Sequence, residues 1–367
     1  MKVSTLNNIL FPVVALTTVG LIFLASISLI ISQQQFNTPF LFIGKQFVAI
    51  VLGFFLMFVT SKIPLSFWYR YHQLILIVVI FLHAMLLVPG IGRHINGSTR
   101  WINLGFINFQ ISELAKIGMV LYMAGFCCRK NDEVRDKLFG FFKPILLLVL
   151  VAMICLMQPD FGAMVVIVLS SSVILFLAGA RIRHFLLFIV MASSSMAVLA
   201  ATSPYRVKRL TSFLDPWAHP FSEGYQLTQA LIAFGKGGSF GVGLGNSLQK
   251  MFYLPEAHTD FLFAVMVEEG GLAIGMLVVG LFAWFAYCGF STAYSMVKKS
   301  QWFSYYLSFG ITFTLILQAL INLGVNMGML PTKGITLPFI SYGGSSILVS
   351  LFAVGILYRC DIESKEI

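Results

Sequence analysis

A polar segment runs straight into a long apolar one in the stretch LPEAHTDFLFAVMV, residues 254–267. Asp260 is the last polar residue of the first part, and apolar residues continue to about position 290, which predicts a membrane-spanning helix. An ionisable residue at the edge of such a helix is costly to hold there and is by default a candidate functional residue. The alternative is that Asp260 is an ordinary helix N-cap, whose side chain accepts hydrogen bonds from the amides of the first turn. Position alone does not decide between the two.

The composition extends the membrane interpretation to most of the chain. Of 367 residues, 58% are hydrophobic and only 10% are charged, and the mean hydropathy is +0.90. No soluble fold could bury so much apolar surface, so the sequence predicts an all-α polytopic membrane protein. Apolar runs near the roughly 20 residues that cross a bilayer predict about ten transmembrane helices, near residues 11–32, 40–61, 72–90, 111–128, 139–157, 161–180, 184–202, 260–290, 302–325 and 342–359.

Positive charge is unequally divided between the short loops on the two sides of these predicted helices. One set of loops, together with both ends of the chain, carries most of it, including Arg70, Arg129, Arg181 and Lys298. By the positive-inside rule this side is cytoplasmic, so both termini are expected there. The polar segment 203–258, between the seventh and eighth predicted helices, then becomes a large extracytoplasmic loop within a single transmembrane domain, residues 1–367.

The sequence argues against several classes of partner and cofactor. The net charge of +10 comes from the loop cations and forms no continuous basic surface, so no nucleic-acid partner is expected. No Cys or His cluster has metal-ligand spacing, and there is no P-loop. The glycine-rich run 235–246 follows no predicted strand, so no organic cofactor is expected either.

Charged residues gather at helix starts and loops on the predicted outer side. Arg100 can bind a phosphate or carboxylate with two hydrogen bonds, while its neighbour Trp101 suits anchoring at the membrane interface. Glu113 and Lys116 lie three residues apart on one helix face and can pair. Asp160 lies in a turn, where it could also cap the next helix. Together they predict a shared polar cavity.

Two further features lie at membrane depth. Glu268 and Glu269 need partners or water inside their span, which predicts a hydrated or salt-bridged bundle interior. The last outer loop, residues 330–346, is apolar yet rich in turn residues, and such backbone is tolerated there only against protein or a watery cavity. Lys333 in this loop would give that cavity positive charge.

The chain resembles the SEDS family (shape, elongation, division and sporulation), the bacterial cell-wall polymerases typified by FtsW and RodA. The resemblance covers nearly the whole chain and, in detail, is nearer to the cell-division type than to the elongation type. The motifs that carry it are RWI (100–102), SExxK (112–116), QPDFG (158–162), GYQ (224–226), LPEAHTDF (254–261), LPTKG (330–334) and SYGGS (341–345). Ile111 stands where the family usually has proline, and Gly270 replaces a usual leucine, so altered helix geometry is expected at both places.

The resemblance implies peptidoglycan glycosyl transfer from lipid II, with undecaprenyl diphosphate leaving MurNAc C1 as a GlcNAc 4-hydroxyl attacks. It makes Asp260 the expected general base. Cations would stabilise the leaving diphosphate, and a divalent cation, Mg²⁺ or Mn²⁺, could assist. The expected substrate-binding residues are Arg100, Trp101, Glu113, Lys116, Asp160, Lys250, His258, Lys333 and Ser341.

The same resemblance implies a place in the cell and a partner. A multi-pass protein of the bacterial inner membrane, at the division septum, is expected to contact membrane lipid and a class B penicillin-binding protein, an FtsI-like transpeptidase. Three other functions stay open: a lipid II flippase, an elongation-type polymerase and a catalytically silent division scaffold. No inverted repeat is obvious, which counts against the flippase.

Overall fold

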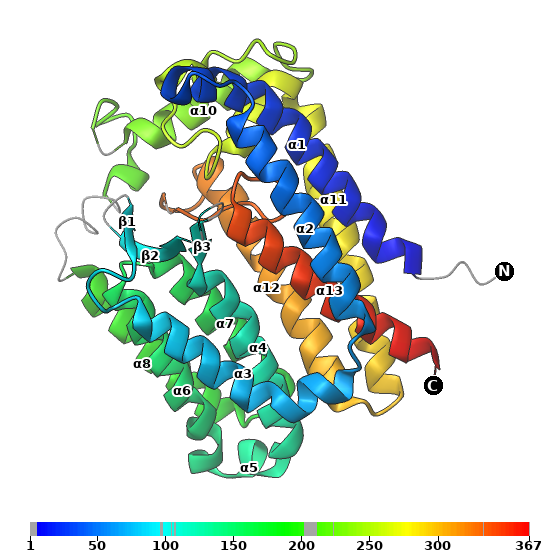
Figure 1. The fold of residues 1–367 in the computed structure, drawn as a ribbon. Coiled ribbons are helices and arrows are strands. Elements are labelled where there is room, and N and C mark those ends of the chain that lie inside the picture. Colours follow the sequence, from blue (N-terminus) through cyan, green and yellow to red (C-terminus); the bar gives the residue numbers. More distant parts are fainter. Residues whose placement is uncertain are drawn as a thin grey trace.

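The computed structural model is a bundle of long helices (Figure 1). It describes residues 6–95, 98–103, 105, 108–201, 211–222, 224–332 and 334–366. The long helices are α1 (Leu6–Phe36), α2 (Leu41–Lys62), α3 (Leu65–Met85), α4 (Ile111–Arg129), α6 (Leu138–Met157), α7 (Phe161–Leu177), α8 (Ile182–Ala201), α11 (Leu262–Lys298), α12 (Trp302–Asn326) and α13 (Gly344–Glu366).

Each of these helices overlaps one of the ten predicted spans, and the all-α prediction is confirmed. Within the described residues, eight helices are long and apolar enough to cross a membrane, and α7 and α8 are apolar but shorter by that measure. The third span differs in register, since 72–90 was predicted and α3 runs over 65–85. It begins directly after Pro64, whose extended backbone (ψ 149°) ends the preceding turn. Arg70, which suggested a loop, lies inside the helix.

The centre of the bundle is α4, which packs against α3, α7 and α12. Helix α12 packs on α11 and α13 as well as on α4, and α2 lies along α13. In Figure 1 the cyan and green helices α3, α4, α6, α7 and α8 therefore form one half, and the remaining long helices form the other. The starts of α4, α7 and α11, which carry most of the predicted site residues, lie at the seam between these halves.

Short elements cover one end of the bundle. Three strands, β1 (Arg93–Ile95), β2 (Ser98–Asn103) and β3 (Asn108–Gln110), pair antiparallel in the order β1-β2-β3. This small sheet was not predicted, and it carries Arg100 and Trp101 on β2, with Trp101 opposite Gln110. The chain after Gly224 forms helix α10 (Tyr225–Gly237), which packs on α11. A short helix, α5 (Asn131–Asp136), lies at the opposite end.

Helix α11 is interrupted next to Gly270, where altered helix geometry was expected. Gly271 has φ 69°, which is left-handed backbone that favours glycine. The chain segment after α10 fills the break, because Val242 N donates to Glu268 O at 3.0 Å and Leu272 N donates to Gly238 O at 2.9 Å. Freed backbone groups inside a membrane span must find such partners. The kink therefore fixes this segment to α11.

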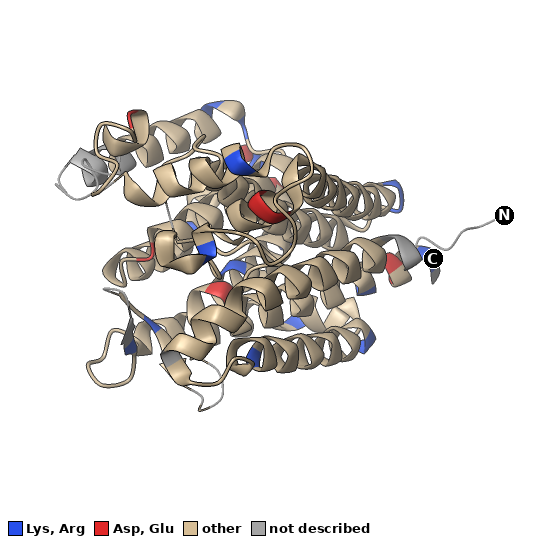
Figure 2. Ribbon diagram, turned by 90° about the horizontal axis from the view of Figure 1, so that it is seen from above, with Lys and Arg blue, Asp and Glu red and all other residues tan. Residues whose placement is uncertain are grey.

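Helix α1 starts and helix α13 ends on the same side of the bundle. Figure 1 shows the start of α1 and the end of α13 at the end of the bundle away from α10. Figure 2 shows that most of the ribbon carries neither sign of charge, as a lipid-facing protein requires.

Candidate functional site

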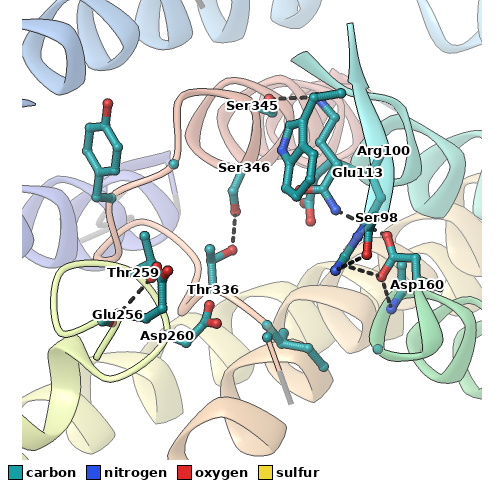
Figure 3. Close-up of a pocket in the computed structure, with 18 of the residues that line it drawn as sticks. Ser98, Arg100, Glu113, Asp160, Glu256, Thr259, Asp260, Thr336, Ser345 and Ser346 are labelled. Atoms are coloured by element: carbon teal, nitrogen blue, oxygen red, sulfur yellow. Dashed lines mark hydrogen bonds and ion pairs between the residues drawn. The ribbon is translucent and has the colours of Figure 1, made fainter. Parts of the chain in front are cut away.

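A polar cavity of about 980 Å³ opens among the starts of α4, α7 and α13, the sheet, the turn before α11 and the loop before α13. In Figure 3, Asp260 and Glu256 lie on one wall, and Arg100 and Asp160 lie on the other. The charged residues that line it, among those described, are Lys45, Arg100, Glu113, Lys116, Asp160, Glu256 and Asp260. Six of the predicted site residues therefore line one cavity: Arg100, Trp101, Glu113, Lys116, Asp160 and Asp260.

Asp260 reaches the cavity from the turn that leads into α11. The N-cap position of that helix belongs to Phe261, so Asp260 is not the N-cap that its position allowed. Its backbone carbonyl accepts hydrogen bonds from Asn322 Nδ2 and Asn326 Nδ2, both at 2.9 Å. A methyl group on Gly334 would lie 3.1 Å from Asp260 Oδ2, so glycine there leaves the carboxylate uncrowded.

The surroundings of Asp260 change its acidity. Burial, and then the negative charge of Glu256, raise the pKa of Asp260 to about 7, while the positive charge of Arg100 acts in the opposite direction. A general base works best when its pKa lies near the working pH. Asp260 therefore has the acidity of a group that exchanges a proton near neutral pH.

Arg100 is held on the facing wall by Asp160. Its Nη1 lies 3.2 Å from Asp160 Oδ1, and its guanidinium carbon lies 5.2 Å from the centre of the Trp101 ring. Asp160 is 2% exposed and also accepts hydrogen bonds from Ser112 Oγ at 2.7 Å and from Ala163 N at 3.3 Å. Asp160 thus caps α7, as its position in the turn suggested, and fixes Arg100 at the same time.

Glu113 and Lys116 form the predicted pair. Lys116 Nζ lies 2.8 Å from Glu113 Oε2, and it also donates a short hydrogen bond to Gln318 Oε1 of α12. Gln318 Nε2 in turn donates to the carbonyl of Thr336 at 3.0 Å. The pair is therefore tied to the loop that lines the cavity.

Three predicted residues are placed differently or not described. The ring of His258 packs against that of Tyr342, which does line the cavity, with centroids 5.7 Å apart. Ser341 Oγ accepts a hydrogen bond from Leu337 N at 2.9 Å and so shapes the loop behind the wall. Lys333 lies outside the described residues.

Lys250 belongs to a second charged cluster, separate from the cavity lining. Its Nζ lies 3.0 Å from Glu269 Oε1 and 3.1 Å from Ser26 Oγ of α1. Glu268 accepts hydrogen bonds from Ser247 Oγ and from the amide of Leu248. The predicted salt-bridged interior is confirmed for Glu269, whose partners are Lys250 and Ser26 of α1, whereas Glu268 is held by hydrogen bonds from the segment before α11. They are bonded within the protein rather than facing the cavity, which weakens the flippase alternative.

Sequence reasoning missed several residues that the structure brings to the cavity or its walls. Lys45 and Glu256 line it, and both had visible signals, a cation in the second apolar run and an acid in the LPEAHTD motif. Gln318, Asn322 and Asn326 contact its walls from α12. Their signal was an amide at every fourth position in the last turns of the predicted span.

The chain is similar to known proteins over nearly its whole length. A model of the FtsW/RodA/SpoVE family, described as "Cell cycle protein", matches residues 7–366. The protein of Coxiella burnetii named "Probable peptidoglycan glycosyltransferase FtsW" is 48% identical over 352 residues, which cover 96% of this chain and 95% of that protein.

Two solved structures share the fold. One, described as "Structural coordination of polymerization and crosslinking by a peptidoglycan synthase complex", has a TM-score of 0.78 at 27% identity and covers 98% of both chains. The crystal structure of the Thermus thermophilus rod shape determining protein RodA has a TM-score of 0.72 at 26% identity, over 97% of this chain and 96% of that one. With the family model matching residues 7–366, the chain belongs to the FtsW/RodA/SpoVE family, the SEDS family that its motifs resemble.

Proposed function

We propose that this protein is a peptidoglycan glycosyltransferase that polymerises lipid II into glycan strands, with Asp260 as its general base. The observation that carries this function is the position of Asp260 on the wall of a cavity of about 980 Å³ that it shares with Arg100 and Lys116. Its relative in Coxiella burnetii bears the name of the same activity.

The reaction joins an acceptor hydroxyl to a donor sugar. The Asp260 carboxylate takes the proton of the GlcNAc 4-hydroxyl, and the freed oxygen bonds to C1 of the donor MurNAc. The bond from C1 to the diphosphate oxygen breaks with its electron pair, so undecaprenyl diphosphate leaves as an anion. With a pKa of about 7, Asp260 is both basic enough to take the proton and ionised in a useful fraction of molecules.

Cations along the cavity would stabilise the charge that develops on the diphosphate. Arg100 and Lys116 already hold carboxylate partners, Asp160 and Glu113. Lys45 lines the cavity with an exposed side chain from the N-terminal part of α2, and no carboxylate within the described residues forms an ion pair with it. We therefore assign Lys45 the most direct contact with the leaving diphosphate.

A divalent cation, Mg²⁺ or Mn²⁺, belongs to the same proposal. The described residues contain no group of three or more His, Cys, Asp or Glu that could hold a metal ion. Mg²⁺, however, commonly binds through one or two carboxylates plus substrate phosphates. Glu256 fits that role, because it lines the same cavity as Asp260 and its negative charge acts there. A bound cation would supply charge neutralisation for the diphosphate.

The place of action follows from the substrate. The protein is a multi-pass membrane protein, and we propose that it lies in the bacterial inner membrane at the division septum, in contact with membrane lipid and with both termini cytoplasmic. The cavity then faces outward, at the side of α10.

A class B penicillin-binding protein of the FtsI type is the proposed partner. In support, a structural neighbour belongs to a complex described as coordinating polymerization and crosslinking.

The decisive experiment compares the unaltered protein with Asp260→Asn on purified lipid II, with and without the penicillin-binding partner. A general base contributes about 10²–10⁴-fold to a rate, so glycan chains should form with the unaltered protein and nearly vanish with the variant. Only the backbone carbonyl of Asp260 bonds to α12, so the variant should still fold and bind its partner. Asp215→Asn is the matched control, since Asp215 is exposed and caps Ala218 in the same loop.

Three results would count against this function. An Asp260→Asn protein that polymerises at an undiminished rate removes Asp260 from catalysis. Lipid movement across reconstituted vesicles without polymer from the unaltered protein would indicate a flippase. Neither activity, in the presence of the partner, would indicate a scaffold.

A further inference from the structure

Three side-chain amides follow one face of α12. Gln318, Asn322 and Asn326 are spaced four residues apart, so they stand one above another over about 12 Å of helix. They are 1%, 2% and 0% exposed. We call these three residues the amide ladder. Buried amides in a membrane span are costly unless each finds hydrogen-bond partners, so the identity of those partners shows what the ladder is for.

The first rung joins the facing charged pair to the cavity loop. Gln318 Oε1 accepts a short hydrogen bond from Lys116 Nζ, and Gln318 Nε2 donates to the Thr336 carbonyl at 3.0 Å. Thr336 Oγ1 donates to Ser346 Oγ at 3.0 Å, and both residues line the cavity. Figure 3 shows this bond crossing the middle of the site.

The other two rungs hold the Asp260 turn. Asn322 Nδ2 donates to the carbonyls of Asp260 at 2.9 Å and Ile335 at 2.6 Å, so it clamps the turn to the loop. Asn326 Nδ2 donates to the Asp260 carbonyl at 2.9 Å, and its Oδ1 accepts from the amide of Ala264 at 3.1 Å. Asp260 lies just before the first helical residue of α11, so its position depends on such contacts rather than on helix geometry.

Other buried polar residues of α12 behave differently. Ser308, Thr312 and Thr314 each donate to the carbonyl four residues back in their own helix, at 2.6, 2.8 and 2.7 Å. Such bonds satisfy a hydroxyl without involving another element. The amide ladder instead donates most of its hydrogen bonds to the two walls of the cavity. In this respect it differs from the other buried polar residues of α12.

We propose, on the basis of the function proposed above, that Gln318, Asn322 and Asn326 are positioning residues of the glycosyltransfer site, which fix Asp260 relative to the Glu113–Lys116 pair. One rigid helix contacts both walls, so the distance from the base to the paired lysine is set by α12. Misplacing a catalytic group by about 1 Å can cost about 10²-fold in rate. The ladder contacts no substrate atom itself and acts through Asp260 and Lys116.

The test uses the full-length protein with its partner and purified lipid II. Asn322→Leu and Asn326→Leu remove the bonds to Asp260 at similar volume, and Thr314→Val is the matched control on the same helix. Each leucine variant should lower kcat about 10²-fold with little change in KM. The pH at half-maximal rate should also fall, on the order of one unit, because a released Asp260 reaches water. The charged groups acting on it, Glu256 and Arg100, are unchanged. Thr314→Val should alter neither quantity.

A purely structural role gives a different pattern. It lowers the amount of folded protein and leaves kcat per folded molecule and the pH midpoint unchanged, which would overturn the proposal. If the leucine variants do not fold, Asn322→Ser and Asn326→Ser replace them, since each keeps one short hydrogen-bond donor. The same directions of change are expected, and an unchanged kcat and pH midpoint would again overturn the proposal. If Asp260→Asn is inactive while the ladder variants behave normally, only the proposed role of the amide ladder is refuted. If Asp260→Asn is active, the proposed function itself is refuted.

Discussion

Lys116 Nζ lies 2.8 Å from Glu113 Oε2 at the edge of the cavity, and the two residues are 4% and 8% exposed. Breaking a buried pair leaves one charge uncompensated and commonly costs about 3–5 kcal/mol. Lys116→Met and Glu113→Gln should each lower the unfolding temperature in detergent and abolish most glycan synthesis.

The chain contains a matched control for that prediction. Lys130 and Glu133 form another pair three residues apart, at 2.6 Å, but on an exposed surface. Exposed pairs contribute little to stability, so Lys130→Met should leave unfolding temperature and activity unchanged. Normal glycan synthesis by both cavity variants would show that the Glu113–Lys116 pair is dispensable.

The pH dependence of polymerisation should follow Asp260. Its pKa is raised to about 7, so the carboxylate form that accepts a proton is scarce below that pH and predominates above it. The initial rate should therefore rise with pH through about 7 and then level off. Glu256→Gln removes a negative charge that raises this pKa, so the midpoint should move to lower pH. Initial rates of glycan formation across this range measure both effects, and a midpoint that Glu256→Gln does not move would contradict them.

Lys45 should matter for the leaving diphosphate. Lys45→Met removes a cation that lines the cavity and should lower kcat by about tenfold or more, since charge stabilisation is lost in the transition state. Lys45→Arg keeps the charge and should retain most activity. Lys62→Met, at the other end of α2, is the control and should polymerise lipid II normally. Equal rates for Lys45→Met and Lys62→Met would remove Lys45 from the site.

The cluster around Lys250 should affect stability rather than chemistry. Lys250 and Glu269 lie 3.0 Å apart with side chains 2% and 0% exposed. Lys250→Met leaves a buried carboxylate, so it should destabilise the protein by about 3–5 kcal/mol, and adding Glu269→Gln should restore much of that loss. Activity per folded molecule should stay near normal. A selective loss of kcat in the stable double variant would instead place Lys250 in the reaction.

Topology can be tested by labelling single cysteines with a membrane-impermeant maleimide in intact cells, after the five native cysteines are replaced by serine. Phe221 is 92% exposed in the loop predicted outside, and Asp132 is exposed in the short helix predicted inside. Phe221→Cys should be labelled, and Asp132→Cys should be labelled only after permeabilisation. The reverse pattern would invert the orientation of the chain.

The sequence by itself determined the spans and the chemistry-bearing motifs. A transmembrane helix satisfies its backbone hydrogen bonds internally, and the bilayer sets its length, so an apolar run of the right size specifies a helix without knowledge of the rest. The same local logic identified the Glu113–Lys116 pair, whose members share a helix face. Where local signals conflicted, as at Arg70 before the third span, the predicted boundary was wrong by several residues.

Only the tertiary structure decided which charges meet. Asn322 and Asp260 are 62 positions apart, Lys116 and Gln318 are 202 apart, and Lys250 and Ser26 are 224 apart. Such contacts depend on how helices pack and where the chain breaks, as at Gly271, and no local pattern encodes either. That is why Lys250, a cation in the right loop, lies in a separate cluster, while the amides of α12, unremarked in the sequence, hold the turn that carries Asp260.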